Sequence, residues 1–247
     1  NETNESPEWG QYWATYIQRK SDEVGHPVYM TEMWDAWDLN DPQHDATIEH
    51  PELYGFVDVS QNNHQVGLTH WENLQAVRQR IKASGHVRPL NMVKIYGANS
   101  GRYGTNRDAQ ERFWRAVFCG VATARFHRPP SGLGLSEITQ AHLRSMRMFT
   151  DEMQITTCEP QLDLIVGRSV NEAYCIANSG VEYGVFFPDG GEIQLQLGAD
   201  TDVTVRWLDI LKSEWHPVTV NQREDNLLSL KTSKSDGYWA VLVQHIS

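Results

Sequence analysis

Hydrophobic residues in the first 155 positions form short runs, separated by longer segments in which apolar positions recur with a helical period. The runs predict strands at residues 28–33, 56–61, 92–96 and 124–127, whose starts lie 28, 36 and 32 residues apart (28 to 56, 56 to 92, 92 to 124). That distance is the length of a strand–helix unit, and the right-handed crossover of such units makes neighbouring strands parallel. We therefore predict four parallel strand–helix units.

The segments between these runs have the spacing of amphipathic helices. Trp9, Tyr12, Trp13, Tyr16 and Ile17 lie at i, i+3, i+4, i+7 and i+8, so they share one helical face. Further helices are expected around residues 71–81, 108–121 and 136–151, with Ser6, Asp108 and Ser136 as candidate N-caps. We interpret these aromatic stripes as core positions rather than cofactor contacts.

The pattern changes after about residue 159, where short β-rich runs are separated by turn sequences rich in Asn, Gly, Asp and Ser. Seven strands are predicted, at residues 162–166, 174–177, 183–187, 193–197, 203–208, 227–230 and 239–243. Short strands at this spacing are typical of an antiparallel β-sandwich. The boundary falls near residues 152–161, which gives a strand–helix domain at 1–155 and a β-sandwich accessory domain at 160–247.

Four parallel strands cannot form a stable sheet without protection, because both edges would be exposed and both faces need cover. We therefore predict the C-terminal half of a (β/α)8 TIM barrel, followed by the antiparallel β-sandwich. In this interpretation the first four barrel units are absent from the chain, lie in a partner, or have been trimmed. A small open sheet that is complete in itself is the alternative.

Composition and charge narrow the possible functions. The chain has 21 Lys and Arg against 32 Asp and Glu, a net charge of −11, which argues against binding nucleic-acid backbones. No apolar run is long enough to span a bilayer. The polar opening N-E-T-N-E-S lacks Met and has no signal peptide, which suggests a chain cut from a longer one. Three widely spaced cysteines make a disulfide framework or a structural zinc site unexpected.

The sequence predicts neither a metal site nor a cofactor. His44, His50, His64 and His70 lie close together in the chain, but without the helical i, i+4 spacing and glutamate of zinc proteases. We interpret them as loop histidines that hydrogen-bond to their neighbours. No nucleophile-elbow motif, phosphate-binding glycine loop or dinucleotide fingerprint occurs, and the glycine-rich stretch 97–104 is expected to be a flexible loop at the mouth of the barrel.

Candidate chemistry lies where the predicted strands end. In a TIM barrel the active site forms at the C-terminal ends of the strands. Glu32 ends the first apolar strand, on the same face as Val28, Met30 and Trp34, and serves either in catalysis or in a salt bridge. Candidate substrate-binding residues from these strand ends are Trp34, Trp37, Gln61, Asn62, Asn63, His64, Lys94, Tyr96, Arg125 and His127. Carboxylates, amides, aromatic rings and cations at one mouth indicate a polyhydroxylated ligand, and nine Trp and nine Tyr favour carbohydrate stacking.

Glycoside hydrolysis requires two carboxyl groups on either side of the scissile bond. Asn1-Glu2 before the first helix resembles the Asn-Glu pair that ends the fourth strand in many retaining barrel glycosidases, and this resemblance implies an acid/base role for Glu2. Glu32 is the candidate second carboxylate, with Asp35 and Asp58 in reserve. The common pattern puts the nucleophile on the seventh strand, whereas here the corresponding strand ends in Lys94-Ile95-Tyr96 without an acid.

Longer motifs carry a more specific resemblance. They are T-E-M-W-D at 31–35, F-V-D-V-S-Q-N-N-H-Q at 56–65, K-I-Y-G at 94–97, E-R-F-W-R at 111–115 and R-F-H-R-P at 125–129. In these the chain resembles the apiosidase-like glycoside hydrolases. N-E-A-Y at 171–174, E-Y-G-V-F-F-P-D-G-G at 182–191 and V-R-W-L-D at 205–209 resemble the collagen-binding-type β-sandwich that follows the barrel of that family.

The resemblance implies a bacterial hydrolase of plant or other complex polysaccharide, in the extracellular space or periplasm. Its expected partners are a carbohydrate substrate and the missing N-terminal half of the barrel, with no nucleic acid and no membrane. Nothing in the sequence argues for collagen itself. The alternative is a non-catalytic glycan-binding or structural module, because half of the barrel is absent.

Overall fold

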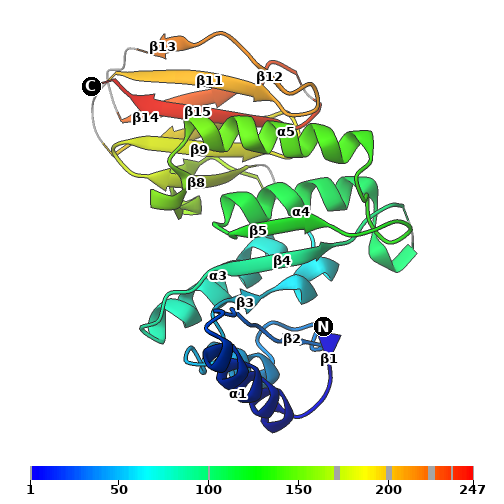
Figure 1. Cartoon of the computed structure of the whole chain (residues 1–247). Coiled ribbons are helices and arrows are strands. Elements are labelled where there is room, and N and C mark those ends of the chain that lie inside the picture. Colours follow the sequence, from blue (N-terminus) through cyan, green and yellow to red (C-terminus); the bar gives the residue numbers. More distant parts are fainter. Residues whose placement is uncertain are drawn as a thin grey trace.

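The computed structural model describes residues 2–99, 101–169, 173–198, 202–221, 226–234 and 236–246, without the side chains of Glu2, Val220 and Asn221. Short parallel strands and their helices form one end of the molecule, and antiparallel sheets form the other (Figure 1). Helices α4 (Asn106–Phe118) and α5 (Glu137–Glu152) lie between the two ends. The architecture is thus a partial β/α barrel followed by an antiparallel β-sandwich, as predicted.

The strand–helix part contains five parallel strands among the described residues. β1 (Glu2–Thr3) pairs with β2 (Met33–Trp34), and β3 (Val57–Asp58), β4 (Leu90–Ile95) and β5 (Thr123–Phe126) form a second sheet in that order. The remaining helices of this part are α1 (Pro7–Val24), α2 (Asp45–Ile48) and α3 (Gly67–Ala83), with 3-10 turns η1 (Pro42–His44), η2 (Ser60–His64) and η3 (Gly101–Tyr103). Since all five strands run the same way, their carboxyl ends gather at one end of the barrel fragment.

In the described part of the chain, the sandwich consists of a seven-stranded and a three-stranded antiparallel sheet. The larger has the order β12-β11-β15-β9-β8-β6, with β13 also paired to β11, and the smaller has the order β14-β10-β7. The strands are β6 (Glu159–Pro160), β7 (Ile165–Val166), β8 (Tyr174–Asn178), β9 (Glu182–Phe187), β10 (Glu192–Gln196), β11 (Val203–Asp209), β12 (Glu214–Trp215), β13 (Thr219–Asn221), β14 (Leu227–Lys231) and β15 (Trp239–His245), with 3-10 turns η4 (Ile155–Thr157) and η5 (Leu162–Leu164).

One hydrophobic core crosses the boundary between the two parts. Trp114 of α4 stacks on Phe186 of β9, with ring centroids 5.8 Å apart and planes inclined by 22°. Gly184 of the same strand leaves room for α5, because a Cβ there would lie 3.0 Å from a Phe149 ring carbon. The opposite face of the large sheet packs on the small sheet around a second core that includes Val185 and Leu195. The large sheet therefore covers α4 and α5 on one side and closes the sandwich on the other.

Local signals at the helix ends were largely readable from the sequence. Ser6 and Ser136 are N-caps, and each hydroxyl oxygen accepts a hydrogen bond from the third following amide, as predicted. The prediction that Asp108 caps α4 is wrong by three positions. Thr105 is the N-cap, and Asp108 sits at the third helical position and bonds back to the Thr105 amide, completing a capping box.

Three other sequence expectations require correction. The strand predicted at 28–33 comprises only Met33–Trp34, and the strand predicted at 56–61 comprises only Val57–Asp58 before a 3-10 turn begins at Ser60. The aromatic stripe of α1 was expected to be core, yet its five side chains are 37% to 63% exposed. Helical periodicity identifies an apolar face, but the described residues of this chain cover it only in part.

Candidate functional site

A pocket of about 410 Å³ opens where the parallel strands end. Its lining residues come from the segments after β1, β2, β3 and β4, and they are Thr3, Asn4, Asp35, Trp37, Gln61, His64, Tyr96, Arg102 and Tyr103. Convergence of loops from successive parallel strands at their carboxyl ends is the arrangement expected of a barrel active site. Five of these nine residues, namely Asp35, Trp37, Gln61, His64 and Tyr96, were among the sequence candidates.

Asp35 is held at the rim by the pairing of β1 with β2. Its amide donates to the carbonyl oxygen of Thr3 at 2.8 Å, which continues the parallel ladder one residue beyond β2. This bond brings Asp35 beside Thr3 and Asn4 in the pocket lining. Among the described side chains that line the pocket, Asp35 is the only carboxylate. Glu2 belongs to β1 and pairs with Met33, but its side chain lies outside the described part of the chain.

Aromatic rings form one continuous wall of the pocket. Trp37 stacks on His64 with ring centroids 4.8 Å apart, and His64 meets Tyr96 edge-on at 5.9 Å. Tyr96 in turn contacts Tyr103 at 4.9 Å, and Arg102 lies over the Tyr103 ring at 5.0 Å. Flat rings beside a carboxylate, an amide and a guanidinium can stack on the face of a sugar while the polar groups bind its hydroxyls.

Asp58 supports the loop after β3 instead of facing the pocket. Its Oδ1 accepts from the Ser60 amide at 2.8 Å, and its Oδ2 accepts from Asn91 Nδ2 at 3.2 Å. The Ser60 hydroxyl oxygen accepts from the Val93 amide at 2.8 Å, which ties the same turn to β4. Burial raises the pKa of Asp58, while the Ser60 hydrogen bonds favour its charged form. This carboxyl is therefore a structural anchor for the turn that carries Gln61 and His64.

The structure does not bring Glu32 into the strand-end pocket. Its Oε2 lies 3.5 Å from the Tyr54 hydroxyl and 3.1 Å from the position of a Cβ on Gly10 of α1. Burial raises the pKa of Glu32, and burial together with the Glu32 charge raises the pKa of Tyr54 to about 12. Glu32 lines a separate groove along α1, with Trp9 and Trp13. Residues 28–32 precede β2 and are not part of a strand, and Thr31 lines the same groove as Glu32, so the predicted alternation of faces does not describe this segment.

Three predicted sugar contacts are buried instead of lining the pocket. Trp34 is 1% exposed, and its indole nitrogen donates to Thr47 Oγ1 at 2.8 Å. Asn62 donates from Nδ2 to the His70 carbonyl oxygen at 2.8 Å and accepts from Asn73 on α3. Asn63 is 1% exposed. Trp34 and Asn62 therefore act as packing and loop-fixing residues, because their polar groups are used within the protein.

The remaining predicted contacts lie near the pocket but outside its lining. Lys94 is within β4, where its charge favours the ionised form of Asp58. Arg125 donates from Nε to the Val93 carbonyl oxygen at 3.2 Å. His127 contacts the Tyr96 ring at 4.9 Å, and its Nδ1 lies 2.7 Å from Ser131 Oγ. Arg125 and His127 line a different hollow, beside β5.

Sequence reasoning missed four pocket residues, although a signal for each was present. Thr3 and Asn4 directly follow Asn1-Glu2 within the polar opening N-E-T-N-E-S. Arg102 and Tyr103 belong to the glycine-rich segment 97–104, which was predicted to be a mouth loop without any residue being singled out. A cation and an aromatic ring within a loop at the mouth were sufficient grounds to include them.

The described residues contain no group of three or more His, Cys, Asp or Glu side chains arranged to hold a metal ion. In the same part of the chain, no helix combines the length and the apolar character needed to cross a membrane. We found no protein-family model and no curated protein sequence that matches this chain.

Solved structures share its fold. A glycoside hydrolase family 5 protein from Bacteroides vulgatus matches 94% of this chain with a TM-score of 0.62 and 13% identity. A second structure, described as a glycoside hydrolase, matches 94% of the chain with a TM-score of 0.59 and 11% identity. The chain therefore has the same fold as the matched parts of these two structures. It spans 58% and 60% of the length of these two structures, so they contain a large part that has no counterpart here.

Proposed function

We propose that the strand-end pocket binds a carbohydrate and that the chain is part of an apiosidase-like glycoside hydrolase of plant or other complex polysaccharide. The observation that carries this proposal is the pocket lining, in which the Trp37, His64 and Tyr96 rings lie beside Asp35 and Gln61. Pyranose and furanose rings have apolar faces that stack on aromatic rings and hydroxyls that bind carboxylates and amides. The glycoside hydrolase fold of the matched structures supports the same assignment.

In this proposal Asp35 and Glu2 are the two carboxyl groups of the reaction. By the resemblance of Asn1-Glu2 to the barrel glycosidases, Glu2 donates a proton to the leaving glycosidic oxygen as its bond to the anomeric carbon breaks. Asp35 then either attacks that carbon or takes a proton from an attacking water. Asp35 replaces Glu32 in this role because it lines the pocket, whereas Glu32 lies against α1.

The complete barrel requires further strand–helix units. The outer edge of β1 and the aromatic face of α1 both need partners, because a parallel sheet edge exposes unpaired amides and the five large apolar residues of α1 are partly exposed. We propose that additional β/α units, like those in the unmatched part of the related structures, pair with this edge and cover this face. Activity on polysaccharide is then a property of the completed barrel.

A second candidate function is glycan binding without cleavage. The observation that favours it is the end of β4, where Lys94 occupies the strand on which the common barrel pattern has a carboxylate nucleophile. A pocket that keeps its aromatic wall but has a single effective carboxylate would bind sugars and leave the glycosidic bond intact.

Binding and cleavage of plant oligosaccharides, measured on one preparation, separate these functions. Calorimetric titration reports binding, and release of reducing ends reports hydrolysis by the full-length protein. We expect Asp35→Asn to lower turnover at least a hundredfold with little loss of affinity, whereas Asp38→Asn on the same loop is the control and retains activity. Binding with no turnover in the wild type selects the non-catalytic function. An absence of binding across pectic and other plant oligosaccharides overturns both assignments.

A further inference from the structure

We propose that Arg112 is a positioning residue that fixes the two loops forming the aromatic wall of the pocket. This inference rests on the proposed carbohydrate-binding function of the pocket for its effect on affinity, but not for its effect on structure. Arg112 does not line the pocket, and its side chain is 2% exposed. It lies on α4, two turns into the helix and on the side that faces the strand ends.

One guanidinium connects the two loops through their main chains. Arg112 Nε donates to the carbonyl oxygen of Gln65 at 2.7 Å, and Nη1 donates to the carbonyl oxygen of Tyr96 at 3.2 Å. Gln65 directly follows His64 at the end of η2, and Tyr96 directly follows β4. Arg112 therefore bonds to both loops at their far ends, beyond the Ser60–Val93 hydrogen bond that ties the start of the turn to β4.

Arg112 fixes the distance between the loop that ends in Gln65 and the loop that begins at Tyr96, and this distance determines how the rings of the wall meet. His64 and Tyr96 come from different strand–helix units, and their rings meet edge-on with centroids 5.9 Å apart. Trp37 stacks on His64 and Tyr103 contacts Tyr96, so both outer rings depend on the same pair. A shift of either loop away from Arg112 would open the wall between His64 and Tyr96.

The chemistry of arginine fits this position. The guanidinium has donors in a rigid planar arrangement, so it can bond to two carbonyl oxygens at a fixed angle, whereas an ammonium is a compact charge on a flexible stem. Burial lowers the pKa of Arg112 to about 10, and the neighbouring Asp108 carboxylate favours its charged form. The group therefore stays protonated at neutral pH.

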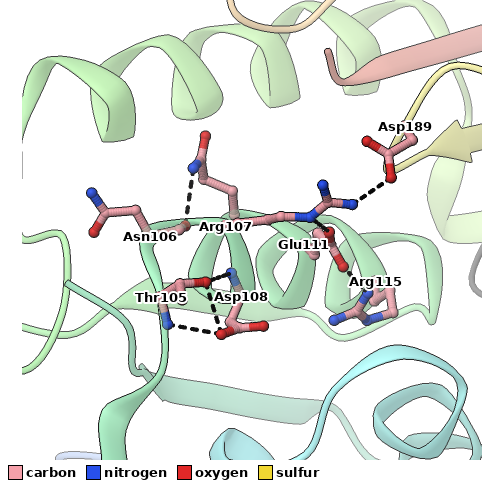
Figure 2. A network of polar contacts seen from close by, with 8 residues as sticks. Thr105, Asn106, Arg107, Asp108, Glu111, Arg115 and Asp189 are labelled. Atoms are coloured by element: carbon pink, nitrogen blue, oxygen red, sulfur yellow. Dashed lines mark hydrogen bonds and ion pairs between the residues drawn. The ribbon is translucent and has the colours of Figure 1, made fainter. Parts of the chain in front are cut away.

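The surroundings of Arg112 are themselves fixed. Asp108 accepts hydrogen bonds from the Thr105 amide and hydroxyl in the capping box of α4 (Figure 2). Gly104, with φ at +82°, keeps the approach open, since a Cβ there would lie 2.9 Å from Asp108 Oδ2 and 3.5 Å from Arg112 Nη1. Gly104 and Asp108 therefore define the surroundings of the guanidinium that bonds to the carbonyl oxygen of Tyr96.

The test compares Arg112→Lys with Arg88→Lys. Arg88 is the control because it is partly buried and, like Arg112, donates to main-chain carbonyls, those of Thr47, Tyr54 and Ile48, none of which lines the pocket. The first readout is the NMR signal of the His64 ring in histidine-labelled protein, assigned with His64→Gln. The second is affinity for the oligosaccharide that the wild type binds, and thermal denaturation gives the stability of each variant.

We expect Arg112→Lys to shift or broaden the His64 signal and to weaken sugar binding at least tenfold. Arg88→Lys should lower thermal stability by a comparable amount while leaving both readouts at their wild-type values. If Arg112→Lys does not fold, Arg112→Gln is measured in the same way. A His64 signal unchanged in the Arg112 variant, or changed equally by Arg88→Lys, overturns the inference. If the wild type binds no sugar, the proposed function fails, whereas the His64 signal still decides the role of Arg112.

Discussion

The indole of Trp37 stacks on the imidazole of His64, with ring centroids 4.8 Å apart and ring planes inclined by 29°. The two residues come from different strand–helix units, one after β2 and the other at the end of the turn after β3. Trp37 is nevertheless 60% exposed, so its outer face is open to the pocket. An exposed tryptophan held in a fixed orientation by a second ring is a pre-formed platform for a flat ligand.

Replacing Trp37 by alanine should therefore affect binding much more than folding. We expect Trp37→Ala to weaken oligosaccharide binding about tenfold or more, since an aromatic stacking contact contributes roughly 1 kcal/mol beyond the area it buries. The free energy of unfolding should fall by no more than about 1 kcal/mol, because the side chain is largely exposed. Isothermal titration and urea denaturation measure the two effects.

Trp9→Ala provides the control for losing an exposed tryptophan. Trp9 is 46% exposed on α1 and lies outside the pocket lining. The Trp9→Ala variant should therefore bind oligosaccharide with the wild-type affinity. Equal affinities for Trp37→Ala and the wild type would remove the stacking platform from the binding site.

Much of the fold was predictable because its signals are local. The helix stripes, the caps at Ser6 and Ser136 and the repeated spacing of apolar runs depend on residues close in sequence. The alternating pattern after residue 159 likewise predicted the sandwich. The exposed stripe on α1 could not be foreseen, because periodicity shows that a face is apolar but not whether the chain supplies its cover.

The candidate site was only partly predictable for a related reason. Side-chain alternation shows which residues share a face of a strand, yet it does not show whether that face points to the barrel mouth or to the helices. Glu32 lies in the segment before β2, where it lines the groove along α1, and the nearby acid Asp35 lines the pocket instead. The two nearby tryptophans also differ in environment, since Trp34 is buried and donates to Thr47 whereas Trp37 lines the pocket.

The buried pair Glu111–Arg115 should be essential for stability. Glu111 Oε2 lies 2.9 Å from Arg115 Nη1, and Oε1 lies 2.6 Å from Arg107 Nε (Figure 2). Arg107 also pairs with Asp189 after β9, so the network joins α4 to the sandwich. Glu111→Gln should lower the free energy of unfolding by about 3 kcal/mol, because it removes the carboxylate beside a fully buried arginine.

Urea denaturation of Glu111→Gln and Glu192→Gln provides the comparison. Glu192 pairs with Lys231 at 2.9 Å on the exposed face of the small sheet. Exposed pairs contribute less than about 1 kcal/mol, so this control should unfold close to the wild-type midpoint. Similar losses for the two variants would show that burial of the Glu111 network adds nothing to its strength.

Gly97 lies where the Tyr96 loop approaches α4 most closely. A Cβ at this position would lie 2.5 Å from the Cβ of Ala109 and 2.9 Å from the carbonyl oxygen of Thr105. Gly97→Ala should therefore displace the loop and lower the free energy of unfolding by about 2 kcal/mol, as overpacking in a rigid region does. Because Tyr96 is adjacent, we also expect weaker sugar binding.

Gly55→Ala is the control for adding a methyl group. A Cβ on Gly55 would lie 3.1 Å from a ring carbon of Tyr29, but that ring is 78% exposed and can rotate away. Thermal denaturation and titration of both variants measure the difference. A tolerated Gly97→Ala, with wild-type stability and affinity, would mean that the Tyr96 loop is not constrained by α4.

We expect the protein to lose stability in mild acid because of the buried His142. It is buried, accepts on Nδ1 from the Trp114 indole nitrogen at 2.8 Å and has its Nε2 2.7 Å from Gln110 Oε1, so the neutral ring carries its proton on Nε2. Burial lowers the pKa of His142 from 6.5 to about 4. Between these two pH values the unfolded chain binds a proton that the folded chain does not, so stability falls as the pH falls.

Protonation of His142 in the unfolded chain should not change the free energy of unfolding above about pH 6.5. Near pH 4 it should lower this free energy by about 3 kcal/mol, since each unit of pKa difference corresponds to about 1.4 kcal/mol. Denaturation of the wild type and His142→Gln at several pH values isolates the loss of stability that is due to His142. The variant should be less stable than the wild type near pH 7, because it alters the bonds to Trp114 and Gln110. The difference between the two should shrink towards pH 4, because the variant has no ring to protonate on unfolding. A difference that stays constant with pH would show that the His142 ring titrates alike in the folded and unfolded chain.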